Sequence, residues 1–107
     1  MSTIAVFTTI DSREKAQEIA NALVARKLAA CVQISAIESV YRWQGKTQRE
    51  PEYRLMVKTI GDQYAEIEAV IRSLHSYELP AIYAFEMTQT FAPYAEWVAD
   101  NSTGEPG

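Results

Sequence analysis

Residues 29–60, AACVQISAIESVYRWQGKTQREPEYRLMVKTI, contain two apolar, β-branched runs separated by a polar turn. The runs at 29–43 and 53–60 have the composition of strands, because β-branched and aromatic side chains favour an extended backbone. Between them, Gly45 marks the tight point of the turn, and Pro51 indicates a strand break or an edge position. The stretch therefore predicts one long antiparallel hairpin.

The apolar residues before the turn change from one face of the predicted strand to the other. Val32 and Ile34 share one parity, whereas Ile37 and Tyr41 share the other. Because successive side chains of a strand alternate between the two faces of a sheet, this change predicts a bulge near residues 35–36.

Hydrophobic periodicity outside the hairpin indicates two more strands and three helices. The order is strand, helix, strand, strand, helix, strand, which is the split-βαβ pattern of ferredoxin-like folds, with a helix added at the end. We therefore predict an α+β fold, ferredoxin-like βαββαβ, with a long hairpin between its second and third strands and a C-terminal helix. The expected strands are 3–9 and 81–89, and the expected helices are 11–27, 61–75 and 92–100.

The sequence also predicts where the first helix begins and how far the folded domain extends. Asp11, followed by Glu14 three residues later, predicts the cap of the first helix. The length suits one domain, which we expect at 1–100. The remaining residues, 101–107, are polar and are expected to form a mobile tail.

Composition excludes several classes of protein. The 107 residues include 10 Lys and Arg against 14 Asp and Glu, a net charge of −4. Nucleic acids are bound through basic surfaces, so this balance predicts no nucleic-acid partner. No apolar run is long enough to span a membrane, and no signal peptide is indicated. The single cysteine cannot form an internal disulfide, which favours a reducing compartment.

Both faces of the predicted sheet are apolar. In the last strand, Ile82 and Ala84 face one way, whereas Tyr83 and Phe85 face the other. Two helices can cover only one face of a four-stranded sheet, and a large exposed apolar patch usually marks an interface. We therefore expect a closed homo-oligomer that covers the second face.

The chain offers few residues with the chemistry of a metal or catalytic site. His75 is the only histidine, and Glu78 lies three residues after it. Both could contribute to a metal site, although a histidine at a helix end more often donates to the last carbonyl groups of the helix. Cys31, the only cysteine, lies in an apolar strand and is expected to be buried and inert.

A second group of candidates lies on the face expected at the interface. If Leu55 and Val57 pack on the helices, Lys58 lies on the opposite face. A lysine there needs an ion pair, with a glutamate such as Glu86, or a bound anion, and the ion pair is the more frequent case. The aromatic candidates, expected as core or interface anchors and alternatively as ligand-stacking groups, are Tyr41, Trp43 and Tyr77.

Four segments occur in a recognisable order and spacing: KLAACVQI (27–34), VYRWQGK (40–46), YRLMVKT (53–59) and HSYELPAI (75–82). With them, the chain resembles the CutA family of divalent-cation-tolerance proteins over residues 4–98. The resemblance implies a ferredoxin-like fold assembled as a PII-type homotrimer, in a cytoplasmic bacterial protein. It also implies a role in tolerance to copper and other divalent ions, with no catalytic activity attached.

The resemblance further implies metal-binding and cleft residues. Copper ligands of some members, a cysteine at the end of the first strand and a pair of histidines after the second helix, correspond here to Thr8, Leu74 and His75. Threonine and leucine do not bind soft metals, so only His75 remains as a metal ligand and Cu²⁺ binding is expected to be weak. The residues that correspond to the family's inter-subunit cleft are Cys31, Tyr41, Trp43, Lys58, Tyr77, Glu78 and Pro80.

The leading hypothesis of function is a non-enzymatic homotrimer that binds divalent metal ions within a tolerance or signalling role. The alternative is a PII-like trimer that senses a small molecule or an anion in the inter-subunit cleft. A module of the RNA-recognition type shares the strand order, but residues 53–60 lack the aromatic and glycine pattern that such a module needs.

Overall fold

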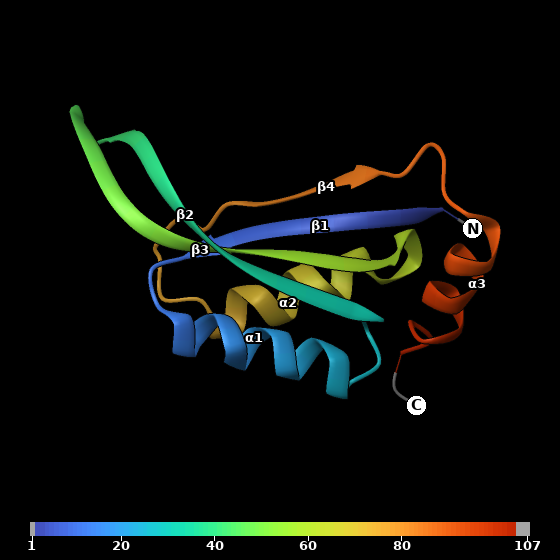
Figure 1. The fold of residues 1–107 in the computed structure, drawn as a ribbon. Coiled ribbons are helices and arrows are strands. Elements are labelled where there is room, and N and C mark those ends of the chain that lie inside the picture. The colour runs from blue at the N-terminus through green and yellow to red at the C-terminus, as the bar shows by residue number, and fades with distance from the viewer. Residues whose placement is uncertain (1, 105–107) are drawn as a thin grey trace.

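The computed structural model describes residues 2–104 and contains the predicted elements in the predicted order (Figure 1). Its strands are β1 (Thr3–Ile10), β2 (Cys31–Trp43), β3 (Lys46–Ile60) and β4 (Ile82–Glu86). They form one antiparallel sheet with the spatial order β2-β3-β1-β4, the arrangement of a ferredoxin-like domain. The predicted α+β fold is therefore confirmed.

Two helices, α1 (Arg13–Ala25) and α2 (Tyr64–Leu74), cover one face of the sheet, and α3 (Ala92–Asp100) lies at one end (Figure 1). A single turn of 3₁₀-helix, Gly61–Gln63, precedes α2, and α3 has the predicted bounds. Within the described part of the chain, residues 2–104, no helix is long and apolar enough to cross a membrane.

The N-terminal cap of helix α1 lies one residue later in the chain than predicted. Ser12 has an extended backbone, and its hydroxyl accepts a hydrogen bond of 3.2 Å from the backbone nitrogen of Lys15. This geometry satisfies one of the free N–H groups of the first turn. The prediction that Asp11 caps the helix is wrong, because Ser12 occupies the capping position.

Strands β2 and β3 pair without interruption, from Cys31 opposite Lys58 to Trp43 opposite Lys46. The predicted bulge near residues 35–36 is therefore wrong. The apolar side chains change face because the inner half of the hairpin packs on the helices, whereas the outer half extends beyond them (Figure 1). In the outer half Tyr41 and Trp43 lie on the opposite face and line a cavity instead.

The outer half of the hairpin is a two-stranded ribbon. Strand β1 ends opposite Tyr53, so residues 46–52 of β3 pair with β2 alone. Pro51 lies in this ribbon as an edge residue and does not break the strand, because no third strand needs its missing N–H. The turn consists of Gln44 and Gly45, whose φ angles of 51° and 79° are typical of a type I′ hairpin turn. The predicted tight point at Gly45 is confirmed.

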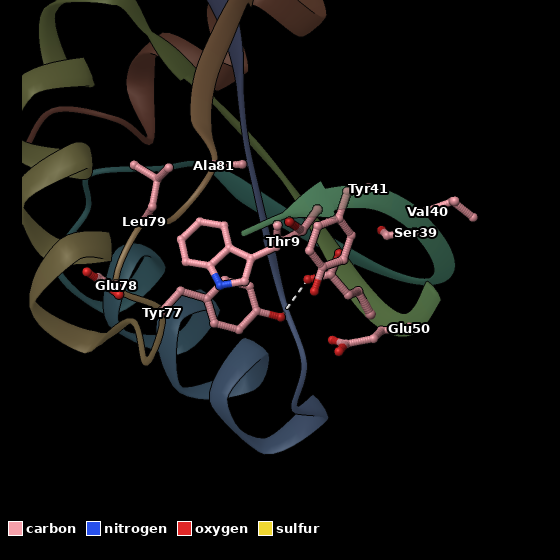
Figure 2. Close-up of a pocket in the computed structure, with 11 residues that line it drawn as sticks. Thr9, Ser39, Val40, Tyr41, Glu50, Tyr77, Glu78, Leu79 and Ala81 are labelled. Atoms are coloured by element: carbon pink, nitrogen blue, oxygen red, sulfur yellow. Dashed lines mark hydrogen bonds between the residues drawn. The ribbon is translucent and has the colours of Figure 1, made fainter. Parts of the chain in front are cut away.

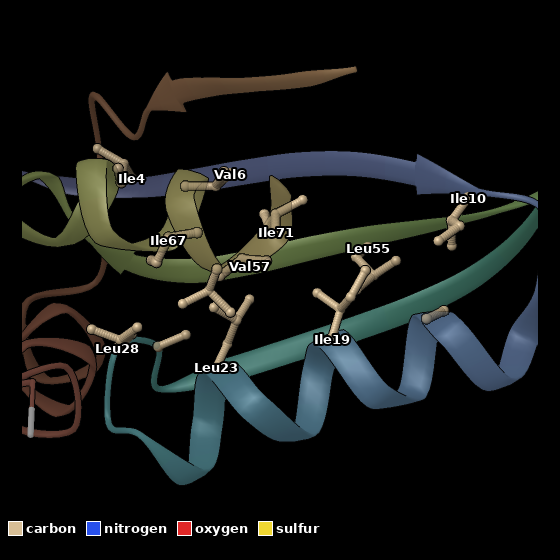
Figure 3. Packing of buried hydrophobic residues seen from close by; sticks show 13 residues of the cluster. Ile4, Val6, Ile10, Ile19, Leu23, Leu28, Leu55, Val57, Ile67 and Ile71 are labelled. Atoms are coloured by element: carbon tan, nitrogen blue, oxygen red, sulfur yellow. The ribbon is translucent and has the colours of Figure 1, made fainter. Parts of the chain in front are cut away.

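The core lies between the sheet and helices α1 and α2 (Figure 3). Leu55 and Val57 of β3 are fully buried on this side, which meets the condition under which Lys58 was expected on the opposite face. The Thr59 hydroxyl, which is also buried, donates a hydrogen bond of 2.7 Å to the backbone oxygen of Leu28. Burial of such aliphatic side chains stabilises a protein by about 1.5–3 kcal/mol each. The largest buried side chains from the helices are Ile19, Leu23, Ile67 and Ile71.

The opposite face of the sheet, here called the open face, is aromatic and largely uncovered. Phe7 stacks on Tyr83 with ring centroids 5.5 Å apart and meets the edge of Phe85 at 5.8 Å. Tyr83 and Phe85 are 43% and 64% exposed. Helix α3 covers only one end of this face, where the Lys58 ammonium lies 5.5 Å from the centre of the Tyr94 ring. The prediction that both faces of the sheet are apolar is confirmed.

The segment after α3 contacts the fold as far as the structure describes it. The Gln63 side chain donates a hydrogen bond of 3.0 Å to the backbone oxygen of Ser102. The backbone N–H of Gly104 donates to the backbone oxygen of Lys27 at 2.8 Å. These bonds hold the first part of the predicted mobile tail, and its remainder, 105–107, lies outside the described residues.

Candidate functional site

A cavity of about 620 Å³ opens between the outer half of the hairpin and residues 75–81, the loop from α2 to β4. We call it the hairpin pocket. Figure 2 shows Tyr77 and Leu79 on its loop side and Tyr41 and Glu50 on its hairpin side. The aromatic and acidic residues that line it are Tyr41, Trp43, Tyr77, Glu50, Glu52 and Glu78.

A hydrogen bond joins the two sides of the pocket. The Tyr77 hydroxyl donates to Oε2 of Glu52 at 2.5 Å (Figure 2). Glu52 is only 6% exposed, and the continuous register of the hairpin holds it opposite Ile37. Burial, this hydrogen bond and the charge of Glu52 all raise the pKa of Tyr77. The contact therefore combines a neutral phenol with a buried carboxylate.

His75 positions the loop from the side of β1. Its Nε2 lies 2.9 Å from the backbone oxygen of Thr9, and its Nδ1 accepts a hydrogen bond of 3.1 Å from the backbone nitrogen of Tyr77. Because Nδ1 is the acceptor, this geometry assigns the proton to Nε2, which donates to Thr9. The imidazole ring also contacts the Tyr77 ring, with centroids 4.7 Å apart.

The expectation that the His75 side chain donates to the last carbonyl groups of α2 is wrong. The backbone N–H of His75 bonds to the oxygen of Ile71, but the ring turns toward β1 instead. The ring reaches Thr9 because α2 and β1 finish at the same end of the sheet (Figure 1). Both ring nitrogens are therefore used to hold the loop.

The hairpin pocket combines negative charge with aromatic walls. Partial burial and the adjacent Glu50 raise the pKa of Tyr41 above its ordinary value, so the negative charge of the pocket comes from its glutamates and not from this phenol. Among the described residues that line the pocket, none is lysine, arginine or histidine. The carboxylates of Glu50, Glu52 and Glu78 therefore favour a cation over an anion.

We expect the contribution of Tyr77 to stability to decline above pH 10. The fold raises the pKa of this phenol, so its stabilisation is complete below the unfolded value of about 10 and falls as the pH rises beyond it. Urea unfolding of the wild type and of Tyr77→Phe at pH 8 and pH 11 measures this. The wild type should be more stable at pH 8, and its advantage should shrink at pH 11. An advantage that is the same at both values would contradict the role of this hydroxyl.

The structure brings together four of the seven residues predicted for the cleft. Pro80 is half-buried in the same loop but does not line the pocket. Cys31 and Lys58 face each other at the other end of the hairpin. The position of these residues between subunits stays a prediction. The four that line the hairpin pocket are Tyr41, Trp43, Tyr77 and Glu78.

The predicted ion pair between Lys58 and Glu86 is wrong. Lys58 lies on the open face, whereas Glu86 is opposite Ile4 and shares the face toward the helices. The two side chains therefore leave opposite faces of the sheet, and the Lys58 ammonium contacts the Tyr94 ring instead. Cys31, which was expected to be buried, is half-buried beside Lys58.

The positions that the resemblance matches to copper ligands do not form a preformed metal centre. Thr8 is fully buried, and its hydroxyl has no hydrogen-bond partner among the described residues. Leu74 has no donor atom, and both nitrogens of His75 are in hydrogen bonds. Within residues 2–104, no three His, Cys, Asp or Glu side chains form a group that could hold a metal ion. A copper site within one chain does not fit these residues, and metal binding by His75 stays a prediction.

The sequence-based prediction missed Glu50 and Glu52, which carry much of the charge of the pocket. In the sequence they flank Pro51 and interrupt a basic run, so they suggest a solvated turn. The register of the hairpin contains the missing signal. With a two-residue turn and no bulge, both glutamates fall on the same face as Tyr41. Because the sequence predicted a bulge and a long turn, the two glutamates were not expected on that face.

Comparison of the chain with known proteins gives consistent matches. The family model described as CutA1 divalent ion tolerance protein matches residues 4–101. A probable divalent-cation tolerance protein cutA homolog of Encephalitozoon cuniculi is 42% identical over 94 residues, which cover 88% of this chain and 82% of that protein. The divalent-cation tolerance protein CutA of Thermus thermophilus is 37% identical over 98 residues, which cover 91% and 95%.

Solved structures share the fold. The periplasmic divalent cation tolerance protein CutA from Archaeoglobus fulgidus matches with a TM-score of 0.91 and 32% identity, over 94% of this chain and 98% of that chain. CutA1 from Oryza sativa also matches with a TM-score of 0.91, at 34% identity over 99% and 97% of the two chains. Relatives from such different organisms do not support the narrower expectation of a bacterial protein.

Proposed function

Because this chain belongs to the CutA1 family of divalent ion tolerance proteins, we propose that it is a homotrimer that acts in tolerance to divalent cations without catalytic activity. The open face supports the assembly, since Tyr83 and Phe85 are exposed and α3 reaches only the Lys58 end. We place it in the cytoplasm, because a single half-buried thiol suits a reducing compartment. Its net charge of −4 disfavours nucleic-acid and anionic-membrane partners.

The acidic lining of the hairpin pocket is the observation that carries the cation role. Glu50 and Glu78 lie at the surface of the pocket, whereas Glu52 is buried and bonded to Tyr77. Carboxylate oxygens bind divalent cations, but one chain supplies too few converging ligands for a closed site. We therefore propose that Cu²⁺ and other divalent cations bind weakly at Glu50 and Glu78, with water or a neighbouring subunit completing the coordination.

Isothermal titration calorimetry with Cu²⁺ tests this proposal. The double substitution Glu50→Gln and Glu78→Gln should weaken Cu²⁺ binding by about tenfold or more, because it removes the two accessible carboxylates. The matched control, Glu66→Gln with Glu96→Gln, removes the same charge from exposed positions on α2 and α3 and should bind as the wild type does. If both double variants bind Cu²⁺ equally well, the pocket is not the site of Cu²⁺ binding.

Sensing of a small molecule is a second candidate, and the size of the pocket favours it. Its volume of about 620 Å³ lies within the range of small-molecule sites, roughly 300–1,000 Å³. An anion is not favoured there, because three carboxylates line the pocket and Lys58 lies elsewhere. The ligand of such a sensor must therefore be neutral or positively charged.

A further inference from the structure

We propose that the hairpin pocket binds an organic ammonium cation, a small molecule with alkyl groups on a positively charged nitrogen, between its aromatic rings and its carboxylates. The proposal names the ligand class for the small-molecule role and rests on that role alone. Weak metal binding at the pocket is neither required for it nor excluded by it.

The walls of the pocket have the composition of a cation-binding aromatic site. Tyr41 and Trp43 come from β2 and are each 38% exposed, whereas Tyr77 comes from the loop. Aromatic faces attract an organic cation through their negative ring centres, most strongly for tryptophan. Aliphatic groups of Leu79 and Ala81 also line the pocket and would contact the alkyl groups of such a ligand.

The aromatic walls are held in place before a ligand binds. The Tyr77 ring is fixed by the Glu52 carboxylate at its hydroxyl and by His75 at its ring and backbone. Tyr41 and Trp43 stand on a ribbon whose pairing is complete up to its type I′ turn. A preformed site loses little conformational entropy on binding, so these contacts favour affinity.

The negative charges of the pocket also suit an organic ammonium cation. Glu52 is almost completely buried and accepts a hydrogen bond from the Tyr77 hydroxyl, so a cation nearby would offset the remaining cost of its desolvation. Glu50 and Glu78 add two more negative groups at the rim. A bare divalent metal ion needs several converging oxygen ligands, which the described residues do not supply. An organic cation instead uses both the carboxylates and the aromatic faces.

Fluorescence of Trp43 provides a direct test. The chain has two tryptophans, and Trp97 lies on α3, stacked on Tyr94 and away from the pocket. The full chain with Trp97→Phe therefore keeps Trp43 as its only reporter. The probe is choline chloride, titrated in EDTA, and the comparison is 3,3-dimethyl-1-butanol, in which carbon replaces the charged nitrogen. We expect choline to change the emission saturably and the neutral isostere to bind about tenfold more weakly or worse.

Two substitutions in the same background locate the site. Tyr41→Leu removes an aromatic wall and Glu50→Gln removes a carboxylate, and each should weaken choline binding about fivefold or more. Glu96→Gln, on the exposed side of α3, removes the same charge and should leave choline binding unchanged. Both pocket residues are partly exposed, so the variants should fold, and circular dichroism checks this.

The possible results separate this proposal from the metal role. Equal binding of choline and its isostere, or no effect of Tyr41→Leu and Glu50→Gln, would overturn the ammonium site whatever Cu²⁺ does. Failure of Cu²⁺ binding with intact choline binding would overturn the metal proposal and leave the ammonium site standing. Absence of any saturable change with choline in EDTA would also overturn the site.

Discussion

Replacement of Phe85 by aspartate should convert the proposed homotrimer into monomers, and light scattering should show the mass fall from about three times 12.0 kDa to 12.0 kDa. Phe85 is 64% exposed in a single chain and lies in the aromatic cluster with Phe7 and Tyr83. A charge placed there must lose its water if the face is covered, and a buried unpaired carboxylate costs several kcal/mol. The same charge in an isolated chain would stay hydrated, so the fold itself should survive.

A matched substitution tests whether the effect belongs to the open face. Val24 is 44% exposed on α1, the helix that packs on the opposite face of the sheet. Val24→Asp introduces the same charge at another exposed apolar position and should keep the mass of the wild type. A wild type that is monomeric at micromolar concentration, or a Phe85→Asp variant that keeps the trimer mass, would contradict the proposed assembly.

The sequence predicts the order of elements because local patterns determine it. The turn glycine Gly45, the alternation around Leu55 and the helical spacing of α2 are all short-range signals. Local patterns do not determine which face of the outer hairpin carries its aromatic side chains. Tyr41 and Trp43 face residues 75–81, the loop from α2 to β4. That loop lies far from the hairpin in the sequence, and the hydrogen bond from Tyr77 to Glu52 joins the two.

The aromatic residues of the site and Glu78 were predicted from the sequence, whereas Glu50 and Glu52 were not. Tyr41 and Tyr77 were expected as core or interface anchors and alternatively as ligand-stacking groups, and the structure places both in one pocket. Glu52 gives no such signal, because a glutamate beside a proline in a charged run usually faces solvent. Its burial depends on the Tyr77 hydroxyl, which reaches it from a loop 25 positions later in the chain.

Replacement of His75 by alanine should lower the free energy of unfolding by about 1–3 kcal/mol, even in EDTA. The substitution leaves the backbone oxygen of Thr9 and the backbone N–H of Tyr77 without their partners, and it removes the ring contact with Tyr77. If His75 served only as a metal ligand, its replacement would not change the free energy of unfolding when metal is absent. Urea unfolding in EDTA therefore distinguishes a loop-positioning role from a purely metal-binding one, with the exposed neighbour Ser76→Ala as the control.

Asparagine at position 75 separates the two hydrogen bonds of the ring. Its side-chain oxygen can accept from the backbone N–H two residues later, which is the bond that Nδ1 of His75 accepts from Tyr77. It has no group that matches the reach of Nε2 to Thr9. His75→Asn should therefore recover about half of the stability that His75→Ala loses, and the Tyr77 contact to Glu52 should persist. If alanine at this position leaves stability in EDTA unchanged, the loop does not depend on the imidazole, and the metal-binding hypothesis for His75 gains support.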